Sequence, residues 1–200
     1  MLREQKKEKR TDMTSWIEEI VKEKKELLAK MEEGYFDSVT AAGDVMIKAL
    51  AAGKKIMTAG NGGSCADAQH FTGEIVGRFL MERDAMAAVT LGVDPAVTTS
   101  LGNDFGYDQV IARQVTGVGR EGDVLLLIST SGNSSNLIEA IKSAKAKGII
   151  TVGLLGKSGG AMKDMCDHTM IVPSSSTPRI QEMHTFTVHL LCQMLEKELN

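Results

Sequence analysis

The stretch DVLLLISTSGNSSN, residues 123–136, joins a wholly apolar run to a polar loop. The run Val124–Ile128 is far shorter than the roughly 20 apolar residues of a membrane span, but it has the length of a buried β-strand. Hydroxyl side chains follow it directly, at Ser129, Thr130, Ser131 and Ser134. A helical pattern begins at the last of them. These residues predict a strand, a ligand-binding loop and a helix in succession.

The hydroxyl groups of this loop predict an anion site. They can donate hydrogen bonds to the three terminal oxygens of a phosphate, and the positive N-terminus of the following helix favours a negative charge there. Residues 129–136 contain no Lys or Arg, so the expected ligand is a small phosphomonoester held by neutral donors. The alternative is that Ser and Thr only cap the helix. One such residue would be enough for a cap, so a cluster of four favours phosphate.

A second loop of this kind is GNGGS, residues 60–64, between a predicted strand at 55–59 and a predicted helix at 64–79. Glycines lack a Cβ and let backbone N–H groups approach an anion at a helix N-terminus. The alternative is a tight turn without a ligand. The loop is not a dinucleotide fingerprint, because Cys65 stands where the third glycine of GxGxxG belongs. The chain also lacks the GxxxxGK[ST] pattern of nucleotide-binding P-loops.

Strands and helices alternate on both sides of these loops, which predicts an α/β fold with a three-layer, doubly wound parallel sheet. We expect the strands at 55–59, 87–91, 123–128, 149–155 and 168–172. We expect helices at 14–33, 36–52, 64–79, 134–147 and 178–198, with short helices between residues 95 and 117 and near 161–165. Two helices therefore precede the first strand, and such a pair often forms an oligomer contact.

Composition narrows the class of protein further. The chain has 200 residues, with 23 basic and 26 acidic side chains and a net charge of −3, which argues against a nucleic-acid-binding surface. No apolar stretch is long enough for a membrane span. The three cysteines form no CxxC pair, which fits reduced thiols. The N-terminal residues are charged and lack the apolar core of a secretory signal. We therefore expect a cytoplasmic protein.

Five motifs in a fixed order carry a resemblance to a known family. They are GNGGS at 60–64, AQHFTGEIVGRF at 68–79, GNDFGYD at 102–108, STSGNSSN at 129–136 and RIQEMH at 179–184. Together they resemble the sugar isomerase (SIS) domain family, which has a flavodoxin-like sheet, and within it the bacterial phosphoheptose isomerases. The resemblance predicts one SIS domain at residues 36–200, after a charged leader and a helix at 1–35.

The resemblance implies an aldose-ketose isomerase. Its reaction would convert D-sedoheptulose 7-phosphate to D-glycero-D-manno-heptose 7-phosphate through an enediol, for the heptose of surface polysaccharides. It also implies a homotetramer with active sites at subunit interfaces and one Zn²⁺ per subunit.

The resemblance assigns roles to individual residues. Glu74 would be the catalytic base; it follows His70 by four residues, one helical turn, whereas a lone Glu is ordinarily a solvated surface carboxylate. His189 would be its acid-base partner. The predicted substrate contacts are Asn61, Gly62, Gly63, Ser64, Glu74, Asn103, Asp104 and Gln181, together with Ser129, Thr130, Ser131 and Ser134.

The zinc ligands implied by the resemblance are His70, Glu74, Gln181 and His189. Gln181 and His189 are eight residues apart, which is about 12 Å along an unbroken helix. Either the last helix begins after Gln181, or the ligands come from different subunits. Spacing alone would have favoured His184, three residues after Gln181. The ion would act as a Lewis acid or would only order the site.

Two alternative functions remain open at this point. One is a non-catalytic SIS tetramer that binds a replication initiator, and the other is an isomerase of a different sugar phosphate. The presence of both Glu74 and His189 favours an enzyme. The chain also departs from some family members, which have Asp where Pro178 stands, so any role of that Asp is unfilled here.

Overall fold

The computed structural model describes the backbone of residues 2–200 and the side chains of residues 13–200. Its centre is a five-stranded parallel sheet in the order β2-β1-β3-β4-β5. The strands are β1 (Ile56–Gly60), β2 (Ala88–Thr90), β3 (Val124–Ser129), β4 (Ile150–Gly156) and β5 (His168–Val172). This is the flavodoxin-like strand order, and it confirms the predicted doubly wound parallel sheet.

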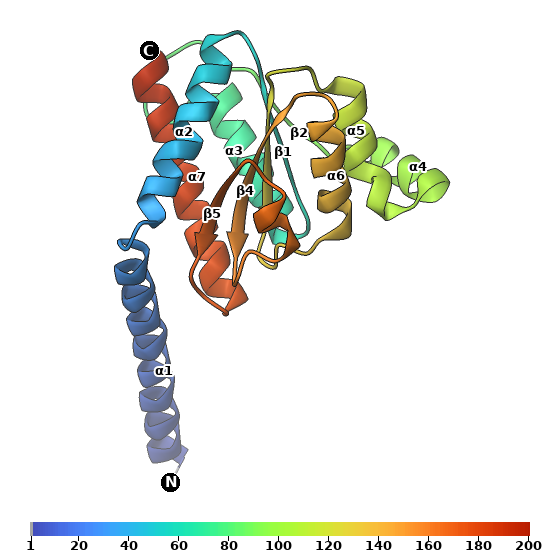
Figure 1. The fold of residues 1–200 in the computed structure, drawn as a ribbon. Coiled ribbons are helices and arrows are strands. Elements are labelled where there is room, and N and C mark those ends of the chain that lie inside the picture. Colours follow the sequence, from blue (N-terminus) through green and yellow to red (C-terminus); the bar gives the residue numbers. More distant parts are fainter. Residues whose placement is uncertain (1) are drawn as a thin grey trace.

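Helices cover both faces of the sheet and complete the three layers (Figure 1). One face packs against α2 (Tyr35–Ala51), α3 (Gly63–Val76) and α7 (Thr177–Leu199), and the other against α5 (Val110–Val118) and α6 (Ser135–Lys145). Every residue of β1 and β3 is buried, because both faces of these strands are covered. The remaining elements are α4 (Pro95–Phe105) and the short 3₁₀ helices at Tyr107–Gln109 and Ala161–Asp164.

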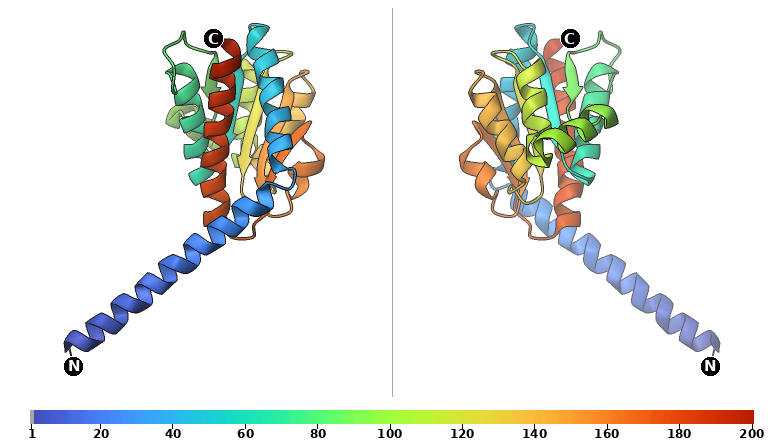
Figure 2. Two further views of the ribbon diagram at one scale, coloured as in Figure 1. Left: turned by 90° about the vertical axis from the view of Figure 1, so that its left-hand side faces the viewer. Right: turned by 90° about the vertical axis from the view of Figure 1, so that its right-hand side faces the viewer.

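The N-terminal helix α1 (Leu2–Met31) projects from the body of the molecule (Figure 2). It begins at Leu2, so the prediction of a start at Thr14 was wrong. No Gly or Pro interrupts residues 2–31, and the Lys, Glu, Gln and Arg residues there propagate a helix readily. The side chains of the charged leader lie outside the described residues. The apolar residues Trp16, Ile17 and Val21 are exposed on the projecting helix.

Helix α3 ends at Val76, three residues before the predicted end at Phe79. The segment that follows has no regular secondary structure as far as Ala87. The pattern of apolar residues continued through Phe79, but the last carbonyl groups of α3 are bound by the Arg83 guanidinium instead of by further helical N–H groups. Among the described residues, no helix combines the length and the apolar character that crossing a membrane requires.

The sheet order places the two predicted ligand loops side by side. β1 pairs with β3 in parallel register, Gly60 lying opposite Ile128. The direction of winding reverses between these two strands, and ligands of open parallel sheets bind at that point, beyond the carboxyl ends of the strands. The division of the chain at residue 36 into a leader region and a domain stays a prediction.

Candidate functional site

A reciprocal pair of amide hydrogen bonds joins the two loops. Asn61 Nδ2 donates to Asn136 Oδ1, and Asn136 Nδ2 donates to Asn61 Oδ1, both at 2.9 Å. The Tyr107 hydroxyl donates a further bond of 2.9 Å to Asn61 Oδ1. Asn136 is 2% exposed, so the pair is largely shielded from water. The Asn61 side chain, predicted to contact substrate, therefore also fixes the loop after β1 against the start of α6.

The loop after β3 is shaped by its own hydroxyl groups. Ser129 Oγ accepts the Gly132 N–H at 3.1 Å, and Ser131 Oγ accepts the Asn133 N–H at 3.2 Å. Gly132 has a φ of +64°, and a Cβ there would lie 1.9 Å from the Gly159 carbonyl oxygen, so only glycine fits. Ser129 is buried, whereas Thr130, Ser131 and Ser134 are partly exposed at the carboxyl edge of the sheet.

The loop after β1 depends on glycine for two close approaches. A Cβ on Gly60 would lie 2.4 Å from the Ser64 carbonyl oxygen, and one on Gly63 would lie 2.5 Å from Gln181 Nε2. The first approach closes the turn, and the second brings Gln181 of α7 to the N-terminus of α3. Gly62 is exposed with a φ of +56°, and Ser64 is buried. Gln181 therefore lies beside the predicted phosphate loop.

Asn103 and Asp104 are exposed on α4, where Asn103 Nδ2 donates to Asp104 Oδ1 at 2.8 Å. Within the described part of the chain, their bonds do not reach either loop. The residues just after them do, since Tyr107 bonds Asn61 and the Ser135 hydroxyl donates to Asp108 Oδ1. The GNDFGYD motif thus reaches the loops through its C-terminal half.

The predicted acid-base residues form a second cluster, on the flanks of α3 and α7. His70 Nε2 lies 3.2 Å from Glu74 Oε1 and 3.3 Å from His189 Nε2. The His70 and Glu74 side chains are 38% and 27% exposed, so a ligand can reach them. The Phe79 ring stacks on the His189 ring, with centroids 5.4 Å apart and an interplanar angle of 24°. The structure therefore brings together, in one chain, three residues that lie up to 119 positions apart.

Two distances in the cluster match the separation expected of ligands on one zinc ion. Two ligands bound to one tetrahedral zinc at about 2.0 to 2.1 Å lie about 3.3 Å apart. That separation is found between the two ring nitrogens and, at 3.2 Å, between His70 and Glu74. Among the described residues, however, no group of three His, Cys, Asp or Glu side chains converges into a finished metal site. Three of these side chains would therefore have to rearrange to surround one ion.

The fourth implied ligand lies elsewhere on the same helix. Helix α7 begins at Thr177, so the alternative that it begins after Gln181 was wrong. Gln181 and His189 both lie on this unbroken helix, about 12 Å apart along its axis. His184, which spacing favoured, is fully buried and donates from Nε2 to the Leu155 carbonyl at 3.0 Å. Burial lowers the pKa of His184, and its hydrogen bond to Leu155 makes it part of the core rather than of the cluster.

Comparison with known proteins identifies the family. The SIS domain profile matches residues 19–156. The chain belongs to the SIS domain family. It is 48% identical, over 92% of this chain and 99% of the relative, to a protein of a Nitratiruptor species named phosphoheptose isomerase. A protein of Clostridium acetobutylicum with the same name is 46% identical over 94% of this chain and 96% of the relative.

Solved structures agree with the relatives found by sequence. The structure of a phosphoheptose isomerase from Francisella tularensis superposes with a TM-score of 0.88 at 34% identity, covering 92% of this chain and 97% of that one. The phosphoheptose isomerase of Neisseria gonorrhoeae gives 0.87 at 37% identity, covering 92% and 99%. The resemblance inferred from the five motifs is confirmed, as is the fold it implies.

Sequence reasoning missed two residues that organise the loops, Asn136 and Tyr107. Both lie inside motifs that were recognised, STSGNSSN and GNDFGYD. A signal was present for Asn136, because an amide directly after a hydroxyl cluster at a helix start must find a partner when it is buried. The signal for Tyr107 was absent, because its bond to Asn61 spans 46 residues.

We expect Asn136→Asp to weaken anion binding at the loops by about tenfold or more. The new carboxylate loses the donor to Asn61 Oδ1 and places a negative charge next to the ligand. The measurement is the rise in melting temperature with increasing inorganic phosphate. Asn133→Asp is the control, because it adds the same charge to an exposed position of the same loop. Equal phosphate affinity in both variants would show that the amide pair does not shape the site.

Proposed function

We propose that this SIS protein is a phosphoheptose isomerase, an enzyme that interconverts D-sedoheptulose 7-phosphate and D-glycero-D-manno-heptose 7-phosphate in the formation of surface-polysaccharide heptose. The observation that carries the proposal is the Glu74–His70–His189 cluster, found in a chain with relatives of this name at 46% and 48% identity over nearly their whole length. A non-catalytic scaffold has no need for an accessible carboxylate beside two imidazoles. An enediol isomerase needs a base for the carbon-bound proton and an acid-base partner for the oxygens, and a carboxylate beside imidazoles supplies both.

The proposed reaction moves one proton between neighbouring carbons. Glu74 removes a proton from C1 of the ketose, which leaves an enediol, and the proton is then delivered to C2 to give the aldose. His189 carries the second proton from the hydroxyl at C1 to the oxygen at C2, so that atoms and charge balance. His70 lies within hydrogen-bond distance of both residues and holds them in register.

The loops supply binding rather than chemistry. Thr130, Ser131 and Ser134, with the backbone N–H groups of residues 62 and 63, would hold the terminal phosphate at the N-termini of α6 and α3. Gln181 lies beside Gly63 and would contact the same end of the sugar. This separation of roles means that loss of the base need not disturb phosphate binding.

A zinc ion is part of the proposal. His70, Glu74 and His189 would hold it, with Gln181 reaching it only by an extended side chain or from another subunit. When bound, the ion would polarise the carbonyl and the adjacent hydroxyl of the substrate and so make the carbon-bound proton more acidic.

The separation between loops and cluster supports active sites shared between subunits. Eleven residues of α3 separate Gly63 from Glu74, which is about 16 Å along the helix axis. The extended heptulose phosphate measures only about 10 Å from phosphorus to C1. Even with the Glu74 side chain inclined towards the N-terminus of α3, one chain leaves a gap of several ångströms.

We propose that a homotetramer closes this gap, with the Glu74 cluster of one subunit serving the loops of another. The exposed apolar residues of the projecting helix α1, Trp16, Ile17 and Val21, supply a surface for such an assembly. The three cysteines are free thiols, which fits a reducing compartment, and we include a cytoplasmic location in the proposal.

We expect wild-type protein to convert sedoheptulose 7-phosphate to the aldose and Glu74→Gln to reduce the rate by at least about 10³-fold, because the amide cannot accept the proton. Phosphate binding should remain within about twofold of wild type, since the loops hold the anion. The measurement is NMR of the sugar in D₂O, where deuterium enters the product at C2. Glu139→Gln on α6 is the control, as it removes a surface carboxylate paired with Lys142.

The same assay separates the alternative functions when ketose 5-phosphates and 6-phosphates are added. Turnover of a shorter sugar but not of the heptulose would indicate an isomerase of another sugar phosphate. Stable sugars in every sample would favour the scaffold that binds a replication initiator. Wild-type turnover by Glu74→Gln would remove this residue from the mechanism.

We expect subunits that carry Glu74→Gln and subunits that carry Asn136→Asp to complement each other when refolded together. Each variant alone retains one intact half of a shared site. At substrate concentrations well below KM, random mixing in an isologous dimer should then restore about a quarter of wild-type activity, because half of the pairs are mixed and one of their two sites is intact. The two variants refolded separately and then combined are the control. Activity that stays at background after co-refolding would place the whole site within one chain.

We expect about one zinc ion per subunit, and its loss in His70→Gln and His189→Gln. The measurement is metal content, together with the visible absorption of the cobalt-substituted protein, which reports coordination without any enzyme assay. His168→Gln at the start of β5 is the control for removing a histidine elsewhere. Unchanged metal content in the His70→Gln/His189→Gln double variant would contradict the assignment.

A further inference from the structure

The segment after α3, residues 77–83, is held by a buried ion pair that the proposed chemistry does not use. Arg83 and Glu196 meet through Nε and Oε1 at 3.0 Å, and each side chain is 1% exposed. Glu196 lies near the C-terminal end of α7, so the pair ties an irregular segment to a helix 113 residues further along the chain. A buried pair of this kind is costly to form and needs its remaining hydrogen-bonding positions filled.

Backbone N–H groups of the segment satisfy the hydrogen-bonding capacity of the Glu196 carboxylate. It accepts the N–H groups of Phe79 at 2.7 Å, Leu80 at 2.8 Å and Met81 at 3.2 Å, in addition to Arg83. Burial opposes ionisation, but these N–H bonds and the guanidinium outweigh it and hold the pKa of Glu196 below its usual value. Three successive amides that point at one carboxylate fix the course of the segment.

Arg83 in turn fixes the end of α3. Its Nη2 donates to the Glu74 carbonyl at 2.7 Å, and its Nη1 donates to the Ile75 carbonyl at 2.9 Å. These carbonyls belong to the last turn of the helix, whose acceptors have no helical partner. The guanidinium thus caps the turn that carries the Glu74 side chain.

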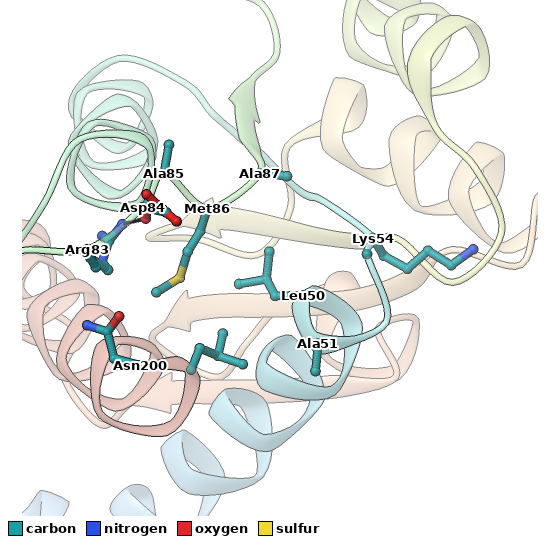
Figure 3. A pocket seen from close by; sticks show the side chains of 11 residues that line it. Leu50, Ala51, Lys54, Arg83, Asp84, Ala85, Met86, Ala87 and Asn200 are labelled. Atoms are coloured by element: carbon teal, nitrogen blue, oxygen red, sulfur yellow. Dashed lines mark hydrogen bonds between the residues drawn. The ribbon is translucent and has the colours of Figure 1, made fainter.

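On its other side, Arg83 lines a pocket of about 460 Å³, where Figure 3 shows it beside Asp84 and close to Asn200 of the chain end.

The segment reaches the proposed acid-base residue through Phe79. The Phe79 ring stacks on one face of the His189 imidazole at 5.4 Å, and the His70 ring meets His189 edge-on at 5.0 Å. Glu196 follows His189 by seven residues, two turns along the same face of α7. Helix α7 therefore carries both the histidine and the carboxylate that holds the aromatic cover over it.

We propose that Glu196 and Arg83 are positioning residues of the isomerase site. They fix residues 77–83 so that Phe79 covers one face of His189 and leaves its Nε2 edge towards His70, which in turn contacts Glu74. This inference rests on the proposed function for its kinetic consequence, whereas the placement of the His189 ring can be tested without any substrate. The hydrogen bonds of the Glu196 carboxylate go to Arg83 and to the backbone of the segment, so its influence on the site passes through them.

The first variant is Phe79→Leu, which keeps an apolar side chain but removes the ring. We expect kcat to fall about tenfold and KM to stay within about twofold, because the change misorients a proton-transfer group without touching the phosphate loops. Phe79→Tyr keeps the ring and should restore kcat to within about twofold of wild type. Equal kcat in wild type, Phe79→Leu and Phe79→Tyr would overturn the proposal.

The second variant is Glu196→Gln, which keeps the shape of the side chain. It replaces one accepting oxygen by an NH₂ group, which cannot accept the N–H groups of residues 79–81. We expect the same loss of kcat as in Phe79→Leu. Asp123→Asn is the matched control. Asp123 is 2% exposed and accepts the N–H groups of Lys55 and Arg120. It lies at the amino edge of the sheet, far from His189. It should lower the melting temperature by a comparable amount with kcat unchanged. A similar loss of kcat in Asp123→Asn would show that general destabilisation is the cause and would overturn the proposal.

The third measurement is NMR of the His189 ring, assigned among the four histidines by single His→Gln variants. Stacking on Phe79 gives its ring protons a ring-current shift, which should vanish in Phe79→Leu and change in Glu196→Gln but persist in Asp123→Asn. A His189 signal that Glu196→Gln leaves in place would overturn the positioning role. If the wild type turned over no sugar, the proposed function would fail, while this spectrum would still decide whether the pair places the ring.

Discussion

The parallel pairing of β1 with β3 is the constraint on which the site depends. It sets Gly60 opposite Ile128, so the chain leaves both strands at the same edge and at neighbouring positions. The two loops are then close enough for Asn61 and Asn136 to exchange two hydrogen bonds. A shift of this register by one residue would turn each buried side chain to the opposite face of the sheet, so burial on both sides locks the geometry of the loops. The geometry of the proposed anion site is thus a consequence of how the core packs.

A second alignment, of α3 with α7, brings together the residues of the proposed acid-base cluster. Both helices start at the carboxyl edge of the sheet and run back across the same face. Residues at similar distances from the two N-termini therefore lie side by side. Gly63 meets Gln181 near their N-termini, and His70 meets His189 two turns later. The spacing of seven residues on one helix therefore matches eight on the other. The Arg83–Glu196 pair closes this arrangement at the far end of both helices.

The position of the cluster relative to the loops is the observation that supports the proposed sharing of active sites between subunits. The cluster lies well along α3, whereas the phosphate would sit at its N-terminus. The extended sugar phosphate is shorter than that length, and in the proposed assembly a second copy of the chain supplies the missing half of the site. The apolar side chains exposed on α1 and the partly exposed histidine and carboxylate are features that a single chain leaves uncovered.

The sequence determined the fold class, the family, the glycine loops and the residues proposed to bear the chemistry. Periodicity sufficed because buried strands and amphipathic helices leave a local signature. It placed β5 within its observed bounds, but it extended α3 to Phe79 because apolar spacing does not reveal a guanidinium that binds the last carbonyl groups. Only the tertiary structure decided that Gln181 and His189 share one unbroken helix, that Asn61 pairs with Asn136, and that Glu196 holds the segment covering His189. The last two contacts join residues 75 and 117 positions apart. The sequence pattern is compatible with many such long-range contacts, and the observed arrangement of strands and helices decides which of them form.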